Sequence, residues 1–280
     1  MKNPKVLYIL ISLFCVFAII AGIYAQFIET TTTGTGPNLA EEDQNIIQEK
    51  TQDEIKSDFN DLFTNTLTLG GFDTTGISKI DSEHDIVYSV YEATELTDNY
   101  EINIHIPVIN IRSELANTYN TMTQTDFISK ANDVINQQDN AVRTIYNIDY
   151  AAYVNNNILS VVIRSTLREG NSAQRVIIRT YNYNLSTNQE ASLLDLITMK
   201  RLNRDDVNNK IMQVVTAENQ EAENLQSMGY NTVFVRDLTS DIYSIDNAGA
   251  YFLGPNQELY IVYAYGNGEF TSEMDVILFE

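Results

Sequence analysis

Residue types that commonly carry out chemistry are scarce in this 280-residue sequence, apart from carboxylates. It contains one cysteine, Cys15, and two histidines, His84 and His105. A single cysteine excludes an intrachain disulfide and a cysteine-cluster metal site. His105 alternates with Ile104 and Ile106 in a predicted strand, which is typical of a packed or surface side chain rather than a metal ligand. We therefore expect no metal site and no cofactor.

The carboxylates do not single out a catalytic pair. Because there are 38 Asp and Glu residues, chance neighbours among them are certain. The sequence contains neither the Gly-x-Ser-x-Gly pattern of a nucleophile elbow nor a phosphate-binding P-loop. We therefore expect no catalytic residues and a protein that is not an enzyme.

The charge of the chain is strongly negative and unevenly distributed. The formal net charge is −21. Residues 143–210 contain 9 Lys and Arg against 6 Asp and Glu, residues 29–142 contain 5 against 21, and residues 211–280 contain 1 against 11. This balance argues against nucleic acid as a partner, because phosphate backbones need basic residues. It favours a basic partner, and the alternative explanation, the more ordinary one, is that the charge serves only solubility.

Four arginines in the basic middle segment are the candidate ligand-binding residues: Arg164, Arg168, Arg175 and Arg179. If the chain turns near residue 170, Arg164, Arg175 and Arg179 are predicted to share one face of a sheet. Two interpretations remain open. The arginines either pair with acidic segments of the same chain, or bind an anionic polymer or a carboxylate-bearing ligand through bidentate guanidinium contacts.

Residues 6–25 form an uncharged apolar run of 20 positions. A helix of that length spans about 30 Å, the thickness of a bilayer core. Lys2 and Lys5 precede the run, which predicts a cytoplasmic N-terminus and an extracellular C-terminal domain held at the cell membrane by a single pass. A signal peptide usually has an apolar region of about 7–15 residues, so we favour a retained anchor over a cleaved signal.

The chain divides by composition into five parts. Residues 1–28 are the predicted anchor, residues 29–40 a Thr/Gly-rich linker, and residues 41–84 an acidic helical segment. The rest is predicted to form two α+β halves, residues 85–198 and 199–280, of one extracytoplasmic domain.

Apolar residues in the two halves change period repeatedly between two and 3.6. A hairpin is predicted around residues 97–99, helices over 115–135 and from Asp205 to Gly229, and three strands over 144–154, 158–167 and 174–185. A closing hairpin and a last strand, MDVILF, follow. Hairpins interrupted by helices predict the α+β class, with an antiparallel sheet on which helices pack.

In this order, several segments resemble one bacterial extracytoplasmic domain family. The segment YNYNLSTNQEASLLDLI, residues 181–197, resembles its strand–turn–Leu-Leu-Asp-Leu unit. YEINIHIPVIN, NNNILSVVIRS and AYFLGPNQELYIVYAYG are similar to three of its strands and hairpins. The family is a domain of unknown function shared by lysozyme-sensing anti-sigma factors of the RsiV type and the N-terminal region of some peptidoglycan deacetylases. The resemblance covers roughly residues 86–280.

The departures from that family limit what the resemblance implies. Residues 167–175 read LREGNSAQR, without the histidine that the family often carries at this turn. Neither a deacetylase catalytic domain nor an anti-sigma segment before the apolar run is present in the sequence. The resemblance thus implies a membrane-anchored, non-enzymatic binding or sensing domain of a bacterial envelope protein, with a cell-wall component or a basic protein such as lysozyme as its ligand. The alternative is an accessory or divergent enzyme acting on peptidoglycan.

Overall fold

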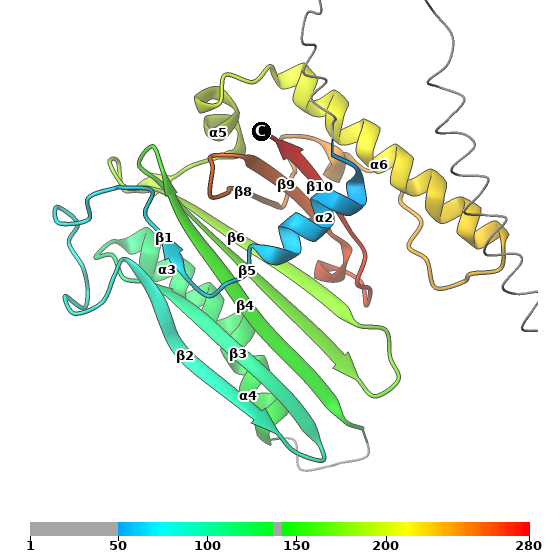
Figure 1. Cartoon of the computed structure of the whole chain (residues 1–280), viewed down its shortest axis with the longest axis horizontal. Coiled ribbons are helices and arrows are strands. Elements are labelled where there is room, and N and C mark those ends of the chain that lie inside the picture. Colours follow the sequence, from blue (N-terminus) through cyan, green and yellow to red (C-terminus); the bar gives the residue numbers. More distant parts are fainter. Residues whose placement is uncertain (1–49, 137–141) are drawn as a thin grey trace, which may run out of the picture. The chain divides into compact units, whose positions relative to one another are not determined.

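A mixed sheet organises the computed structural model, which describes residues 50–136 and 142–280 of the chain (Figure 1). Its main path runs β2-β3-β4-β5-β6-β7, and β1 pairs with β4. These strands are β1 (Leu67–Thr68), β2 (Val87–Leu96), β3 (Tyr100–Ile109), β4 (Thr144–Asn155), β5 (Ile158–Glu169), β6 (Arg175–Asn184) and β7 (Gln189–Glu190). The predicted strands are therefore present.

The purely antiparallel sheet that we expected is wrong in one respect. Strand β4 pairs in parallel with both β3 and β1, whereas β2–β3, β4–β5, β5–β6 and β6–β7 are antiparallel. The physical reason is the helical connection after β3. It consists of α3 (Glu114–Thr123), the π-helical turn η1 (Gln124–Ile128) and α4 (Ser129–Asn136). A connection of this length returns the chain to the end where β3 began, as a parallel neighbour requires.

The two faces of the large sheet carry different layers (Figure 1). Even-numbered side chains of β4, such as Ile148, lie in a core with Phe127 of η1 and Ala131 of α4. Odd-numbered ones, such as Tyr153, lie in a second core with Phe59 of α2 (Gln52–Asp61). Period-two alternation therefore buries both faces of the central strands.

A second, three-stranded sheet in the order β10-β9-β8 packs on the second of these faces. It consists of β8 (Ala250–Leu253), β9 (Leu259–Ala264) and β10 (Met274–Phe279). Its other face forms a third core with α5 (Leu193–Met199) and α6 (Arg204–Ser227). By packing, α5 thus belongs with the second half of the chain, although the predicted boundary placed it at the end of the first.

The outer edge of β8 is satisfied by side chains of the large sheet. The backbone N–H of Tyr251 donates to Thr180 Oγ1 at 3.1 Å, and that of Leu253 donates to Ser160 Oγ at 3.1 Å. Asn182 donates to the carbonyl of Tyr251 at 2.8 Å. An open strand edge is a liability. Here the polar side chains of the large sheet bind the free backbone groups of this edge, and the same hydrogen bonds join the two sheets.

Capping explains where the second-half helices begin. Ser192 and Asp195 form a capping box at α5, which accounts for the order of residues in SLLDLI. The helix predicted to begin at Asp205 begins one residue earlier, at Arg204. Asn203 accepts from the N–H groups of Asp205 and Asp206, so Asp205 lies in the first turn, where its charge favours the helix dipole.

The acidic segment predicted as helical over residues 41–84 contains one described helix, α2, in which Ile55 and Phe59 are buried. Residues 62–84 are mainly turns. Among residues 50–136 and 142–280, no helix is long and apolar enough to cross a bilayer. The predicted anchor and linker lie outside the described residues.

Gly266 provides a stability test of the contact between η3 (Tyr265–Asn267) and β6. A Cβ at this position would overlap the carbonyl oxygen of Val176, a backbone atom that cannot move aside alone. We expect Gly266→Ala to lower the free energy of unfolding by about 3 kcal/mol or more in urea denaturation. Gly268→Ala is the matched control, because a Cβ there meets nothing within 4 Å. Equal stability of the two variants would show that the η3 contact contributes little.

Candidate functional site

The four predicted arginines do not form one row. In the register of β5 and β6, Leu167 pairs with Arg175 and Ile163 with Arg179, whereas Arg164 pairs with Ile178. Because side chains alternate along a strand, Arg164 lies on the opposite face from Arg175 and Arg179. The one-face prediction was wrong because it depended on a register that the sequence does not specify.

Three of these arginines are occupied by groups of the same chain. Arg164 lies 4.2 Å above the ring of Phe63 and donates to Asn60 Oδ1 at 2.9 Å. Arg179 Nη2 donates to Asp126 Oδ2 at 2.7 Å. Arg175 holds η3 by donating to the carbonyls of residues 266 and 267. The side chain of Arg168 is exposed and forms no hydrogen bond or ion pair with the described residues.

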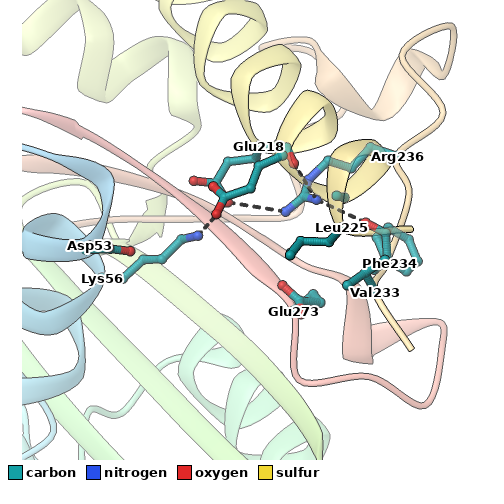
Figure 2. Close-up of a pocket in the computed structure, with 10 residues that line it drawn as sticks. Asp53, Lys56, Glu218, Leu225, Val233, Phe234, Arg236 and Glu273 are labelled. Atoms are coloured by element: carbon teal, nitrogen blue, oxygen red, sulfur yellow. Dashed lines mark hydrogen bonds and ion pairs between the residues drawn. The ribbon is translucent and has the colours of Figure 1, made fainter. Parts of the chain in front are cut away.

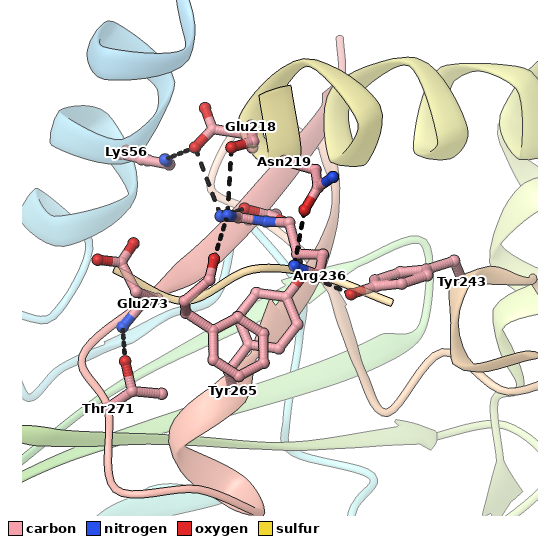
Figure 3. A network of polar contacts seen from close by, with 10 residues as sticks. Lys56, Glu218, Asn219, Arg236, Tyr243, Tyr265, Thr271 and Glu273 are labelled. Carbon is pink, nitrogen blue, oxygen red and sulfur yellow. Dashed lines mark hydrogen bonds and ion pairs between the residues drawn. The ribbon is translucent and has the colours of Figure 1, made fainter. Parts of the chain in front are cut away.

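A different arginine lies at the centre of the densest polar network, drawn in Figure 3. Arg236 follows α6 in a loop and is 5% exposed, and Asp275 of β10 is 0% exposed. Their side chains form a two-pronged ion pair, with Nε to Oδ2 at 2.9 Å and Nη2 to Oδ1 at 2.5 Å. Bidentate contacts of this kind are the strongest hydrogen bonds of an arginine.

The rest of the network satisfies the remaining polar groups. Tyr265 donates its hydroxyl proton to Asp275 at 2.5 Å, and Tyr243 donates to Tyr265 at 3.0 Å. Arg236 donates to the carbonyl of Phe234 at 3.0 Å and receives support from Asn219, which accepts its backbone N–H at 2.7 Å. The network therefore fixes the loop after α6 against β9 and β10.

Burial and charge set the protonation of this network. Burial alone would lower the pKa of Arg236, but its hydrogen bonds to Asp275 and the carboxylate charge outweigh this and raise the pKa overall. Burial, and then the charge of Asp275, raise the pKa of Tyr265 far above its usual range. Tyr265 is thus a neutral hydrogen-bond donor and not a nucleophile.

A small charged hollow lies at the solvent side of Arg236 (Figure 2). It measures about 170 Å³ and lies between α2 and α6. Lys56 of α2 donates to Glu218 of α6 at 2.6 Å, and Glu218 lies 3.6 Å from the Arg236 guanidinium. Asp53, Glu221 and Glu273 complete the acidic part of the lining.

A larger open groove of about 600 Å³ adjoins this hollow and shares Val233, Phe234 and Glu273 with it. Its other lining comes from the β5–β6 turn, residues 231–232 and residues 269–272. We call the two hollows together the acidic groove. It is the candidate functional site, because it combines apolar walls, a few converging polar groups and a rigid base.

The side chains that sequence analysis considered for chemistry lie in separate places in the described part of the chain. Asp275 is enclosed, so it cannot reach a substrate. His84 forms an exposed contact with Asp81 at 3.0 Å, and His105 lies 3.8 Å from Glu92. Within residues 50–136 and 142–280, no group of three or more His, Cys, Asp or Glu side chains is placed to hold a metal ion.

Sequence reasoning missed the central pair, although two signals were present. Arg236 is the only Lys or Arg in residues 211–280. Asp275 interrupts the otherwise apolar strand MDVILF. Together, Arg236 and Asp275 indicate a buried ion pair. A carboxylate buried without a counter-charge costs several kcal/mol of folding free energy, so a partner for Asp275 is expected.

Comparisons with known proteins assign no function to the chain. No protein-family model and no curated protein matches the sequence. A DUF3298 family member from Bacteroides fragilis is 14% identical over 65% of this chain and 80% of its own, with a TM-score of 0.34. A DUF3298 family protein from Pseudomonas aeruginosa is 12% identical over 66% of this chain and 83% of its own, with a TM-score of 0.36. Both of these proteins are described as DUF3298 family proteins, a name that states no function.

The buried pair makes a sharp stability prediction. Asp275→Asn leaves the buried Arg236 without its counter-charge, and we expect it to lower the free energy of unfolding by about 3–5 kcal/mol in urea denaturation. The double variant Arg236→Met/Asp275→Leu removes both charges and should recover most of that loss.

The control is the exposed pair of Arg204 and Asp246, with side chains 47% and 70% exposed. Arg204→Gln should change stability by less than about 1 kcal/mol, because solvent screens the pair. If Asp275→Asn were no more harmful than Arg204→Gln, the network would not determine the stability of this region.

Proposed function

We propose that this chain is a membrane-anchored extracytoplasmic domain of a bacterial envelope protein that binds a basic protein such as lysozyme and does not catalyse a reaction. The acidic groove is the observation that carries the proposal. It offers carboxylates and apolar walls to a partner, whereas its two cations are already engaged. Lys56 is bound by Glu218, and Arg236 by Asp275.

The charge of the whole domain supports the same partner. Residues 50–136 and 142–280 hold 15 Lys and Arg against 32 Asp and Glu, a balance of −17. Several cations that could repel a basic partner lie in ion pairs within the chain, including Lys50, Lys130 and Arg143. The remaining field is negative and attracts a basic protein from a distance.

Two alternatives from the sequence are less well supported. Binding of an anionic wall polymer depended on an arginine row, and β5 and β6 place Arg164 apart from Arg175 and Arg179. An accessory or divergent peptidoglycan enzyme needs an acid or base that is both held in place and open to its substrate, and the most firmly held carboxylate, Asp275, is completely buried. A binding domain needs neither feature.

The proposal predicts salt-sensitive binding. Purified residues 41–280 should bind lysozyme at low ionic strength, and the affinity should fall at least tenfold between about 0.05 M and 0.5 M NaCl, because salt screens exposed charges. Titration calorimetry would measure it, with an acidic protein of similar size as the control. Peptidoglycan fragments incubated with the domain should stay intact. Failure to bind lysozyme at low salt, or turnover of the fragments, would reject the function.

The location forms a separate prediction. We expect the domain to lie outside the cytoplasm, held by residues 6–25, because Lys2 and Lys5 precede that run. Protease added to intact protoplasts should digest the domain, while a cytoplasmic marker enzyme survives. Protection of the domain until the membrane is lysed would contradict this orientation.

A further inference from the structure

The acidic groove is bordered by apolar side chains that a solvated loop does not need. Phe270 lines the larger hollow and is 40% exposed. Val233 and Phe234 line both hollows and are half-buried. Single exposed apolar residues are ordinary, but several beside one groove mark an interaction surface.

Glu218 is paired with Lys56, but the other four carboxylates of the groove are not neutralised by the protein itself. Asp53, Glu221, Glu269 and Glu273 line it and form no ion pair with any residue that the structure describes. Glu273 lies in the wall shared by both hollows. A ligand seated here therefore meets negative charge directly beside an apolar wall.

Both walls are held in place before any ligand arrives. On one side, Arg236 donates to the carbonyl of Phe234 at 3.0 Å. On the other, the N–H of Val176 donates to the carbonyl of Thr271 at 3.1 Å, and the N–H of Tyr265 donates to the carbonyl of Glu273 at 3.1 Å. A preformed groove loses little conformational entropy on binding.

We propose that the acidic groove holds a short segment of the basic partner in which an apolar side chain stands next to a lysine or arginine. The apolar side chain packs against Phe270 and Val233, and the cationic group reaches Glu273 and Glu269. This inference rests on the proposed function and adds the place and the chemistry of recognition. Charge alone would draw the partner to the domain, whereas the groove selects the segment that binds.

The test compares two synthetic peptides of equal length and charge, one of alternating Lys and Leu and one of alternating Lys and Ser. The parent domain should bind the Lys-Leu peptide at least tenfold more tightly, because only this peptide fills the apolar part of the groove. The variant Phe270→Ser/Glu273→Gln should lose at least tenfold in affinity for the Lys-Leu peptide and for lysozyme. Fluorescence anisotropy would measure the peptides, and thermal melting would confirm that the variant is folded.

The matched control is Leu96→Ser/Glu95→Gln on the exposed edge strand β2, where Leu96 is 71% exposed. It removes the same kinds of group far from the groove in sequence and should change affinity by less than twofold. If both variants bind like the parent, or lose affinity equally, the groove assignment is wrong while binding of basic proteins stands. If the parent binds neither lysozyme nor either peptide, the proposed function fails as well.

Discussion

The constraint on which the second half of the structure depends is the burial of one carboxylate. Asp275 lies in β10 with no exposure to solvent, on the face that packs toward α5 and α6. Removing a charge from water costs several kcal/mol unless it is paired and hydrogen-bonded. Arg236 and Tyr265 meet that requirement from a loop and from the end of β9. One buried charge thus determines where three segments, distant in sequence, come together.

Hydrogen bonds that satisfy buried polar groups also join the two sheets. The edge of β8 is capped by Thr180, Ser160 and Asn182, and Asn267 pairs with the backbone of Ile178 at the side of β6. The Asn267 contact fixes the loop around residues 266–273, and the pair of Arg236 with Asp275 fixes residues 231–236. The larger hollow of the acidic groove lies between those loops, so buried hydrogen bonds hold its walls.

Periodicity made most of the fold predictable, because strands β2 to β6 alternate clearly and α5 follows a capping box at Ser192. What could not be predicted depends on non-local choices. The sheet face on which Arg164 lies relative to Arg175 and Arg179 depends on the register of β5 against β6. A shift of one residue in the five-residue turn between these strands would reverse it, and the local sequence does not determine that register. The parallel pairing of β3 and β4 depends on the path of a helical crossover. The pairing of Arg236 with Asp275, 39 residues apart, appears only once α6 and β10 are packed together.

The internal pairing of cations also explains why the surface should prefer a basic partner to an anionic one. Three of the four arginines expected to attract anions have other roles: Arg179 binds Asp126, Arg164 lies over Phe63, and Arg175 fastens η3. Each engaged guanidinium stabilises the fold and is no longer free to meet a phosphate or carboxylate. Carboxylates outnumber these cations and remain at the groove without such bonds. The basic segment of the sequence therefore contributes ion pairs and hydrogen bonds within the fold, and in the proposed function the acidic segments attract the partner.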